Sequence, residues 1–198
     1  IDLPEGTDLY SPVVYAKAAE NLQKMLDAGV IARDEKPCYY VYRIVMGSHV
    51  QTGIVAAASV VEYDSNRIKK HEFTRPDKED DRVRQIEALN AQTGPVFLAY
   101  SKAPAIDEIL ASTVTATPDA DATADDGIRH TLWVIRDEAT IAQITRKFDA
   151  LPALYIADGH HRSAAASRVA AARRGKGRPD SAEYFLAVIF PVSAFVVA

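Results

Sequence analysis

A short apolar run, a polar turn and an alanine-rich run follow one another late in the chain, and together they predict a strand that leads directly into a helix. The apolar run covers 153–157, the turn is Asp-Gly-His-His-Arg at 158–162, and the last run covers 163–174. Alanine favours helix, and the six alanines of the last run let a helix pack close to a sheet. Because α/β folds bind ligands where a buried strand ends, we expect the site of this chain at 158–162.

The rest of the chain alternates between helical and strand patterns, which predicts one mixed α/β domain over residues 1–198. Ser11 and Asp137 have the character of helix N-caps, and glycine ends the first and last predicted helices. The segments 47–53 and 113–127 predict, respectively, a hairpin with a longer loop and a flexible loop rich in Thr, Ala, Asp and Pro. Helices are expected at 11–29, 83–89, 104–110, 137–148 and 163–174, and strands at 39–46, 54–63, 96–100, 128–135, 153–157 and 184–191.

Composition excludes several classes of protein. The 198 residues are 48% hydrophobic and 25% charged, with a net charge of −4 and no basic block, which argues against a dedicated nucleic-acid binder. The single cysteine, Cys38, excludes an internal disulfide framework and a cysteine-rich zinc site, and it fits a reducing compartment. No run reaches the roughly 20 apolar residues of a membrane span and no signal peptide is visible, so we expect a cytoplasmic protein without a membrane partner. The sequence does not decide between a monomer and a homo-oligomer.

Both ends of the sequence suggest a fragment of a longer protein. The chain begins at Ile1 without a methionine, and it stops inside the apolar run 184–198, which would be expected to lead into further structure. We therefore expect a domain that is truncated at both ends.

The residue types of the turn at 158–162 suit the binding of an anion. Gly159 lets the backbone approach a ligand, and Arg162 can hold a phosphate or a carboxylate with two hydrogen bonds. His160 or His161 can donate to an oxyanion or shuttle a proton. The alternative is that Asp158 only caps the helix and that the histidines are surface residues.

A second polar segment, 71–82, carries groups for acid/base chemistry beside the end of a strand. His71, Glu72, Thr74 and Arg82 supply an imidazole, a carboxylate, a hydroxyl and a cation, although alternating charge is also typical of a solvated loop and helix start.

A metal site is a third hypothesis, because several of the same side chains are suitable ligand types for zinc or manganese. Adjacent histidines do not easily converge on one ion, and the HExxH and paired-cysteine patterns are absent from the sequence. We assign no metal ligands in the preferred interpretation. The side chains of suitable type are His71, Glu72, Asp158, His160 and His161.

Three motifs together resemble a large, mostly bacterial family of domain-of-unknown-function proteins. They are His-Glu-x-Thr with Lys-Glu-x-Asp-Arg (71–82), Pro-Val-Phe-Leu-Ala-Tyr (95–100) and Tyr-Ile-Ala-Asp-Gly-His-His-Arg (155–162). That family distantly resembles the ParB/sulfiredoxin-like superfamily, and in particular its free-serine kinases, which carry an Asp-Gly-His-x-Arg turn. The resemblance implies a mixed sheet with flanking helices. It also implies that Asp158, Gly159, His160, His161 and Arg162 bind nucleotide phosphates.

The preferred hypothesis is therefore an ATP- or ADP-dependent phosphotransferase that uses Mg²⁺ and acts on a small hydroxyl compound such as free serine. Its expected catalytic residues are His160, His161, Glu72 and Asp158, and His71 and Arg82 join the turn in binding the nucleotide. The kinase residue that activates the substrate hydroxyl has no counterpart in this chain, and Glu72 is a candidate substitute. Two alternatives stay open: a ParB-like nucleotide-binding switch without chemistry, and a metal-dependent hydrolase.

Overall fold

The computed structural model describes residues 2–175 and 180–194, and it confirms the mixed α/β class. An eight-stranded sheet forms the centre of the molecule, with strand order β3-β7-β4-β8-β2-β1-β6-β5. Two neighbouring pairs, β3 with β7 and β4 with β8, are parallel, and the other pairs are antiparallel. The strands are β1 (Tyr39–Met46), β2 (His49–Ser59), β3 (Ile68–Lys69), β4 (Val96–Tyr100), β5 (Ala120–Thr123), β6 (Arg129–Ile135), β7 (Leu154–Asp158) and β8 (Tyr184–Pro191).

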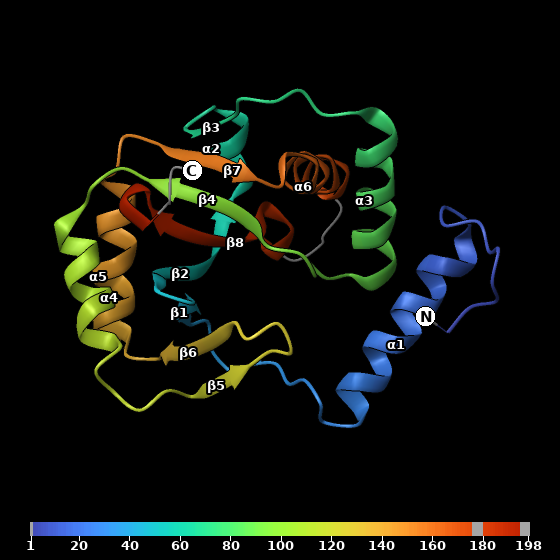
Figure 1. Cartoon of the computed structure of the whole chain (residues 1–198). Coiled ribbons are helices and arrows are strands. Elements are labelled where there is room, and N and C mark those ends of the chain that lie inside the picture. Colours follow the sequence, from blue (N-terminus) through green and yellow to red (C-terminus); the bar gives the residue numbers. More distant parts are fainter. Residues whose placement is uncertain (1, 176–179, 195–198) are drawn as a thin grey trace.

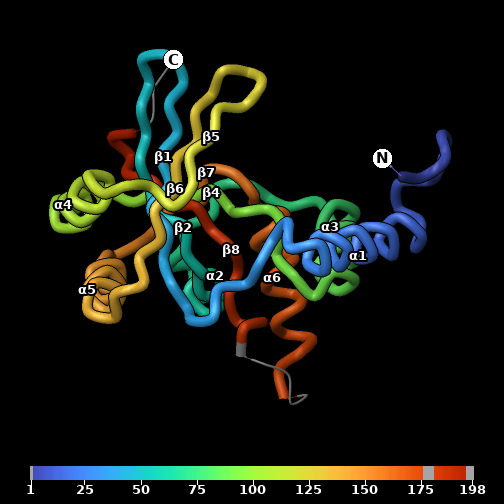
Figure 2. Tube along the Cα trace, turned by 90° about the horizontal axis from the view of Figure 1, so that it is seen from below, coloured from blue at the N-terminus to red at the C-terminus, as the bar shows by residue number. Residues whose placement is uncertain are grey.

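Helices cover both faces of this sheet (Figure 1). In Figure 2, α4 and α5 lie on one side of the strands, and α3 and α6 lie on the other, with α1 packed against α3. The helices are α1 (Pro12–Asp27), α2 (Val60–Asp64), α3 (Pro76–Leu89), α4 (Pro104–Thr113), α5 (Glu138–Asp149) and α6 (His160–Arg173), with short 3-10 helices at Asp180–Glu183 and Val192–Ala194.

The core lies between the sheet and these helices. Leu98, Ile54 and Phe185 are almost fully buried in the central strands. Four of the six alanines are buried in α6: Ala164, Ala166 and Ala170 pack into the core with the sheet, as expected, and Ala165 joins Ile86 of α3 in a second apolar cluster. This close packing holds α6 against α3.

The structure corrects the sequence prediction at several places. The helix expected at 83–89 begins earlier, at Pro76, and the helix expected at 163–174 begins at His160, so that most of the predicted turn belongs to α6. The loop expected at 47–53 is wrong because β2 begins at His49, so that the hairpin turn is only Gly47-Ser48. The strand expected at 54–63 ends at Ser59, whose hydroxyl accepts a hydrogen bond from the Glu62 N–H and caps α2. The loop expected at 113–127 contains the edge strand β5, which pairs with β6.

In the part of the chain that the structure describes, no helix combines the length and the apolar character that a membrane crossing requires.

Candidate functional site

The two polar segments come together because of the parallel pairing of β3 with β7. Ile68 pairs with Leu154 and Lys69 pairs with Tyr155, so that both strands point the same way. The carboxyl ends of parallel neighbours meet at one edge of a sheet. The chain that leaves β3 therefore places His71 beside the first turn of α6, which follows β7.

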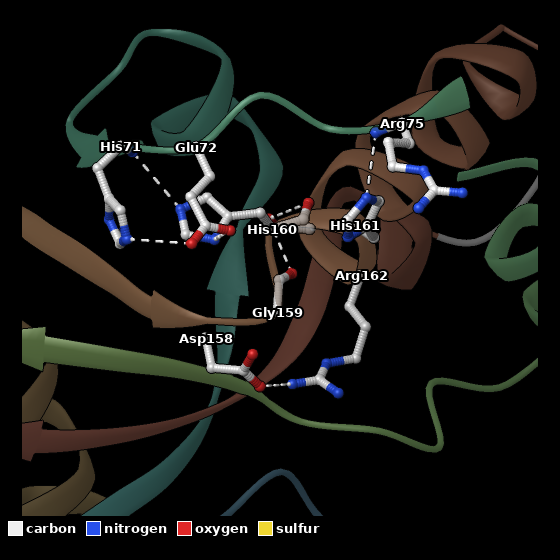
Figure 3. Close-up of polar contacts among 9 residues, drawn as sticks. His71, Glu72, Arg75, Asp158, Gly159, His160, His161 and Arg162 are labelled. Atoms are coloured by element: carbon white, nitrogen blue, oxygen red, sulfur yellow. Dashed lines mark hydrogen bonds and ion pairs between the residues drawn. The ribbon is translucent and has the colours of Figure 1, made fainter. Parts of the chain in front are cut away.

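Three ionisable side chains gather at this edge (Figure 3). The Glu72 carboxylate lies 3.5 Å from Nδ1 of His160 and 3.8 Å from Nε2 of His71. The two imidazole rings meet edge to face, with centroids 4.4 Å apart. One nitrogen or oxygen atom from each side chain lies within 4.8 Å of the other two. We call these three residues, His71, Glu72 and His160, the His-Glu-His cluster.

The three members of the cluster differ in exposure. His160 is only 4% exposed, whereas the side chains of His71 and Glu72 are 58% and 62% exposed. Burial lowers the pKa of His160 below its usual value, the His71 imidazole lowers it further, and the Glu72 carboxylate opposes both effects. His160 is therefore neutral near pH 7, and a neutral imidazole can accept a proton or bind a cation.

The first turn of α6 combines an open helix end with an arginine. Gly159 is the N-cap with φ +98°, and among the described residues no side chain caps this helix. The backbone N–H groups of the first turn are thus free to bind an anion, which the helix dipole also favours. The guanidinium of Arg162 forms an ion pair with Asp158 at the end of β7, and its Nε atom is buried with no hydrogen-bond partner in the described structure.

Gly159 is required here for a second reason besides its positive φ. A Cβ atom at this position would lie 2.9 Å from both Nε and Nη2 of Arg162, which is closer than real Cβ contacts. Arg162 can lie over the turn only because residue 159 has no side chain. On the other side, Gly94 also approaches Arg162, since a Cβ at Gly94 would lie 3.2 Å from Cδ of that side chain.

The two adjacent histidines face different groups. Nε2 of His161 accepts a hydrogen bond of 3.1 Å from the backbone N–H of Arg75, and the ring lies apart from the His-Glu-His cluster (Figure 3). The expected nucleotide ligand Arg82 lies on α3, where it pairs with its neighbour Asp81 at 3.3 Å. The residues of the turn thus separate into two groups: His160 belongs to the His-Glu-His cluster, and Arg162 lies over Gly159 beside Asp158.

Sequence reasoning missed two contributors to this arrangement. Arg75 takes part through its backbone, and a backbone donor leaves no signal in residue type. Gly94 lies between the helix expected at 83–89 and the strand expected at 96–100, and its contact with Arg162 depends on the tertiary fold. Thr74, which the sequence did single out, donates a hydrogen bond to Glu79 of α3.

A cavity of about 410 Å³ lies elsewhere, between α5 and the sheet. It is lined mainly by small and apolar residues, including Ala56, Ala58, Phe148 and Leu154, with Arg67 also at its wall. None of its lining residues belongs to 71–82 or 158–162, so the cavity is separate from the polar site.

Comparison with known proteins places the chain in a family. The family model described as protein of unknown function (DUF1015) matches residues 1–197. The chain belongs to this family. Neither the curated proteins nor the solved structures give a significant match. Membership of DUF1015 agrees with the resemblance to a domain-of-unknown-function family, and it assigns no reaction to the site.

Proposed function

We propose that this DUF1015 chain is a nucleotide-dependent phosphotransferase that acts on a small hydroxyl compound such as free serine. The observation that carries the proposal is the first turn of α6, where an uncapped helix N-terminus and the Arg162 guanidinium lie within one turn of the His-Glu-His cluster. Phosphoryl transfer depends on positioning and on charge neutralisation, which this combination of groups can supply.

Arg162 and Asp158 have paired roles in this proposal. The backbone N–H groups of His160 and His161 bind the phosphates, and Arg162 turns from Asp158 to the incoming anion. The Asp158 carboxylate, which is 72% exposed, is then free to take the proton of the acceptor hydroxyl. The acceptor oxygen forms a bond to the transferred phosphorus, and the bond from that phosphorus to the bridging oxygen of the nucleotide breaks.

The test separates binding from turnover. Binding of ATP, ADP and CTP is measured by calorimetry with Mg²⁺, and product formation is followed by phosphorus NMR over a panel of hydroxyl amino acids. Arg162→Ala should weaken nucleotide binding roughly 10- to 100-fold, which is the loss expected for a hydrogen-bonded charge. Asp158→Asn should lower kcat by about 100-fold or more without weakening binding, because it removes the base and also the charge that competes for Arg162. Asp125→Asn, in the exposed turn between β5 and β6, is the matched control and should change neither quantity.

Each other hypothesis predicts a different outcome. Nucleotide binding without a phosphorylated acceptor would favour the ParB-like switch, and release of inorganic phosphate or another hydrolysis product would favour the hydrolase. The phosphotransferase proposal is wrong if none of the three nucleotides binds the wild-type protein. It is also wrong if Asp158→Asn keeps full turnover.

A further inference from the structure

We propose that the His-Glu-His cluster, His71, Glu72 and His160, is a binding site for one divalent transition-metal ion of the zinc type. The proposal concerns metal binding itself and does not rest on the proposed phosphotransfer.

The spacing of the three side chains is the first argument. Direct hydrogen bonds between these atom types measure about 2.7–3.0 Å, whereas Glu72 lies 3.5 Å from His160 and 3.8 Å from His71. Ligand atoms of a tetrahedral zinc ion, each about 2.1 Å from the metal, are about 3.4 Å apart. The cluster is therefore too open for tight hydrogen bonding and close to the size that one ion requires, with all three ligand atoms within 4.8 Å of each other.

The supporting structure is the second argument. His160 is held rigidly, because it is buried and starts a helix packed on the sheet. His71 and Glu72 approach it from the solvent side on the segment that follows β3. An ion bound there would have two nitrogen ligands and one oxygen ligand, and its remaining positions would face solvent. Three protein ligands with an open position are the pattern of catalytic zinc sites.

The adjacent His161 is excluded from this ligand set by its own contact. Its Nε2 atom accepts the Arg75 N–H at 3.1 Å, so the two neighbouring histidines do not have to converge on one ion. The N–H of His71 lies 3.5 Å from Nε2 of His160, at the outer limit of a hydrogen bond. A metal ion on Nδ1 of His160 places the ring proton on Nε2, which can then no longer accept the His71 N–H. Metal binding therefore requires that this weak contact opens.

The donor set also predicts which metal binds. Mg²⁺ prefers six oxygen ligands, whereas imidazole nitrogens favour zinc and other later first-row metals. We therefore expect a transition-metal ion at the His-Glu-His cluster. The hypothesis of a kinase that uses Mg²⁺ would have placed Mg²⁺ in this part of the site.

The experiment is a metal titration of the whole chain without nucleotide. The protein is stripped with a chelator and titrated by calorimetry with Zn²⁺ and, separately, with Mg²⁺, and Co²⁺ absorption reports inner-sphere nitrogen ligands. Wild type should bind one Zn²⁺ per chain at least 100-fold more tightly than Mg²⁺. His71→Ala and Glu72→Gln change exposed side chains and should fold, and each should weaken Zn²⁺ binding about 100-fold or more. His161→Ala should bind Zn²⁺ as wild type does.

Two results would overturn the metal site. One is the absence of stoichiometric Zn²⁺ binding to wild type, which would leave the approach of Glu72 to His160 as a polar contact without a metal. The other is equal Zn²⁺ affinity in wild type, His71→Ala and Glu72→Gln, which would mean adventitious surface binding. Zinc binding without any phosphoryl transfer would keep the metal site and reject the phosphotransferase, so the two proposals fail separately.

Discussion

Replacing Gly159 with alanine should destabilise the protein by about 2 kcal/mol, through two separable causes. The first is the backbone, because φ is +98° and an L-residue in the left-handed region costs roughly 1–2 kcal/mol. The second is Arg162, whose Nε and Nη2 atoms would lie 2.9 Å from the new Cβ. The guanidinium has to move away and lose its ion pair with Asp158, which contributes up to about 1 kcal/mol at a partly exposed position.

Gly127→Ala is the matched control for the backbone cost. Gly127 has φ +81°, and nothing lies within 4 Å of a Cβ built there, so only the strain of the positive φ applies. Urea unfolding can be followed through the fluorescence of Trp133, the single tryptophan, which is buried in β6. We expect Gly127→Ala to cost about 1 kcal/mol and Gly159→Ala about 1 kcal/mol more.

A double-mutant cycle then tests the assignment of this excess to Arg162. In the Arg162→Ala background, Gly159→Ala should cost no more than Gly127→Ala does, because the clash no longer exists. The reasoning is refuted if the two glycine variants cost the same in the wild-type background. It is refuted equally if the excess persists after Arg162 is removed.

Three further predictions concern the scaffold. Gly53→Ala should destabilise by roughly 3 kcal/mol or prevent folding, as judged by circular dichroism and urea unfolding, because its Cβ would lie 2.5 Å from the Ile189 carbonyl oxygen; retained wild-type stability would contradict this. Arg67→Ala should cost about 2 kcal/mol in the same assay, since the guanidinium donates to three carbonyls around the C-terminal end of α5, and Arg67→Lys should recover only part of the loss. The Val134 N–H, and then Arg136, lower the pKa of Asp119, so the stability that Asp119 adds is complete above its unfolded pKa of about 3.9 and is lost as the pH falls through the lower folded value. The difference in urea midpoint between wild type and Asp119→Asn should therefore be constant above about pH 5 and shrink as the pH falls below about 4, and a difference that does not change at low pH would argue against it.

Many of the helices and strands were predictable because the spacing of apolar residues and the helix-capping residues indicated the same elements. β8 has the bounds expected from its apolar run, and Asp137 caps α5 by accepting the Thr140 N–H, as its position in the sequence suggested. Such signals depend on neighbouring residues only, so a single sequence contains them.

The errors arose where tertiary contacts override local preference. Gly53 was interpreted as part of a loop, but it lies in β2, where only glycine tolerates the close approach of β8. Val60 and Val61 are β-branched residues, which favour strands, yet they form the start of α2. Ser59 is the N-cap of this helix. β5 was missed because its residues are all exposed, and its pairing is supported by an ion pair between Asp121 and Arg129 that spans both strands.

For the site too, the sequence predicted which residues take part, but not the tertiary contacts between them. Sequence reasoning selected His71, Glu72 and the turn at 158–162 as parts of one site, and the structure brings the first two against His160. It did not predict how they meet, because the pairing that joins them involves only two residues of β3. The opposite orientations of His160 and His161 were equally hidden, since one depends on burial and the other on a backbone donor of Arg75.

Both edge strands of the eight-stranded sheet, β3 and β5, are short. An open strand edge is a template for intermolecular pairing, and native proteins limit it with short strands and charges. Here β3 offers two residues at one edge, and β5 offers four at the other, among them Asp121 in its ion pair with Arg129. The shortness of β3, which brings His71 and Glu72 to His160, therefore also limits the backbone that this edge offers to a neighbouring chain.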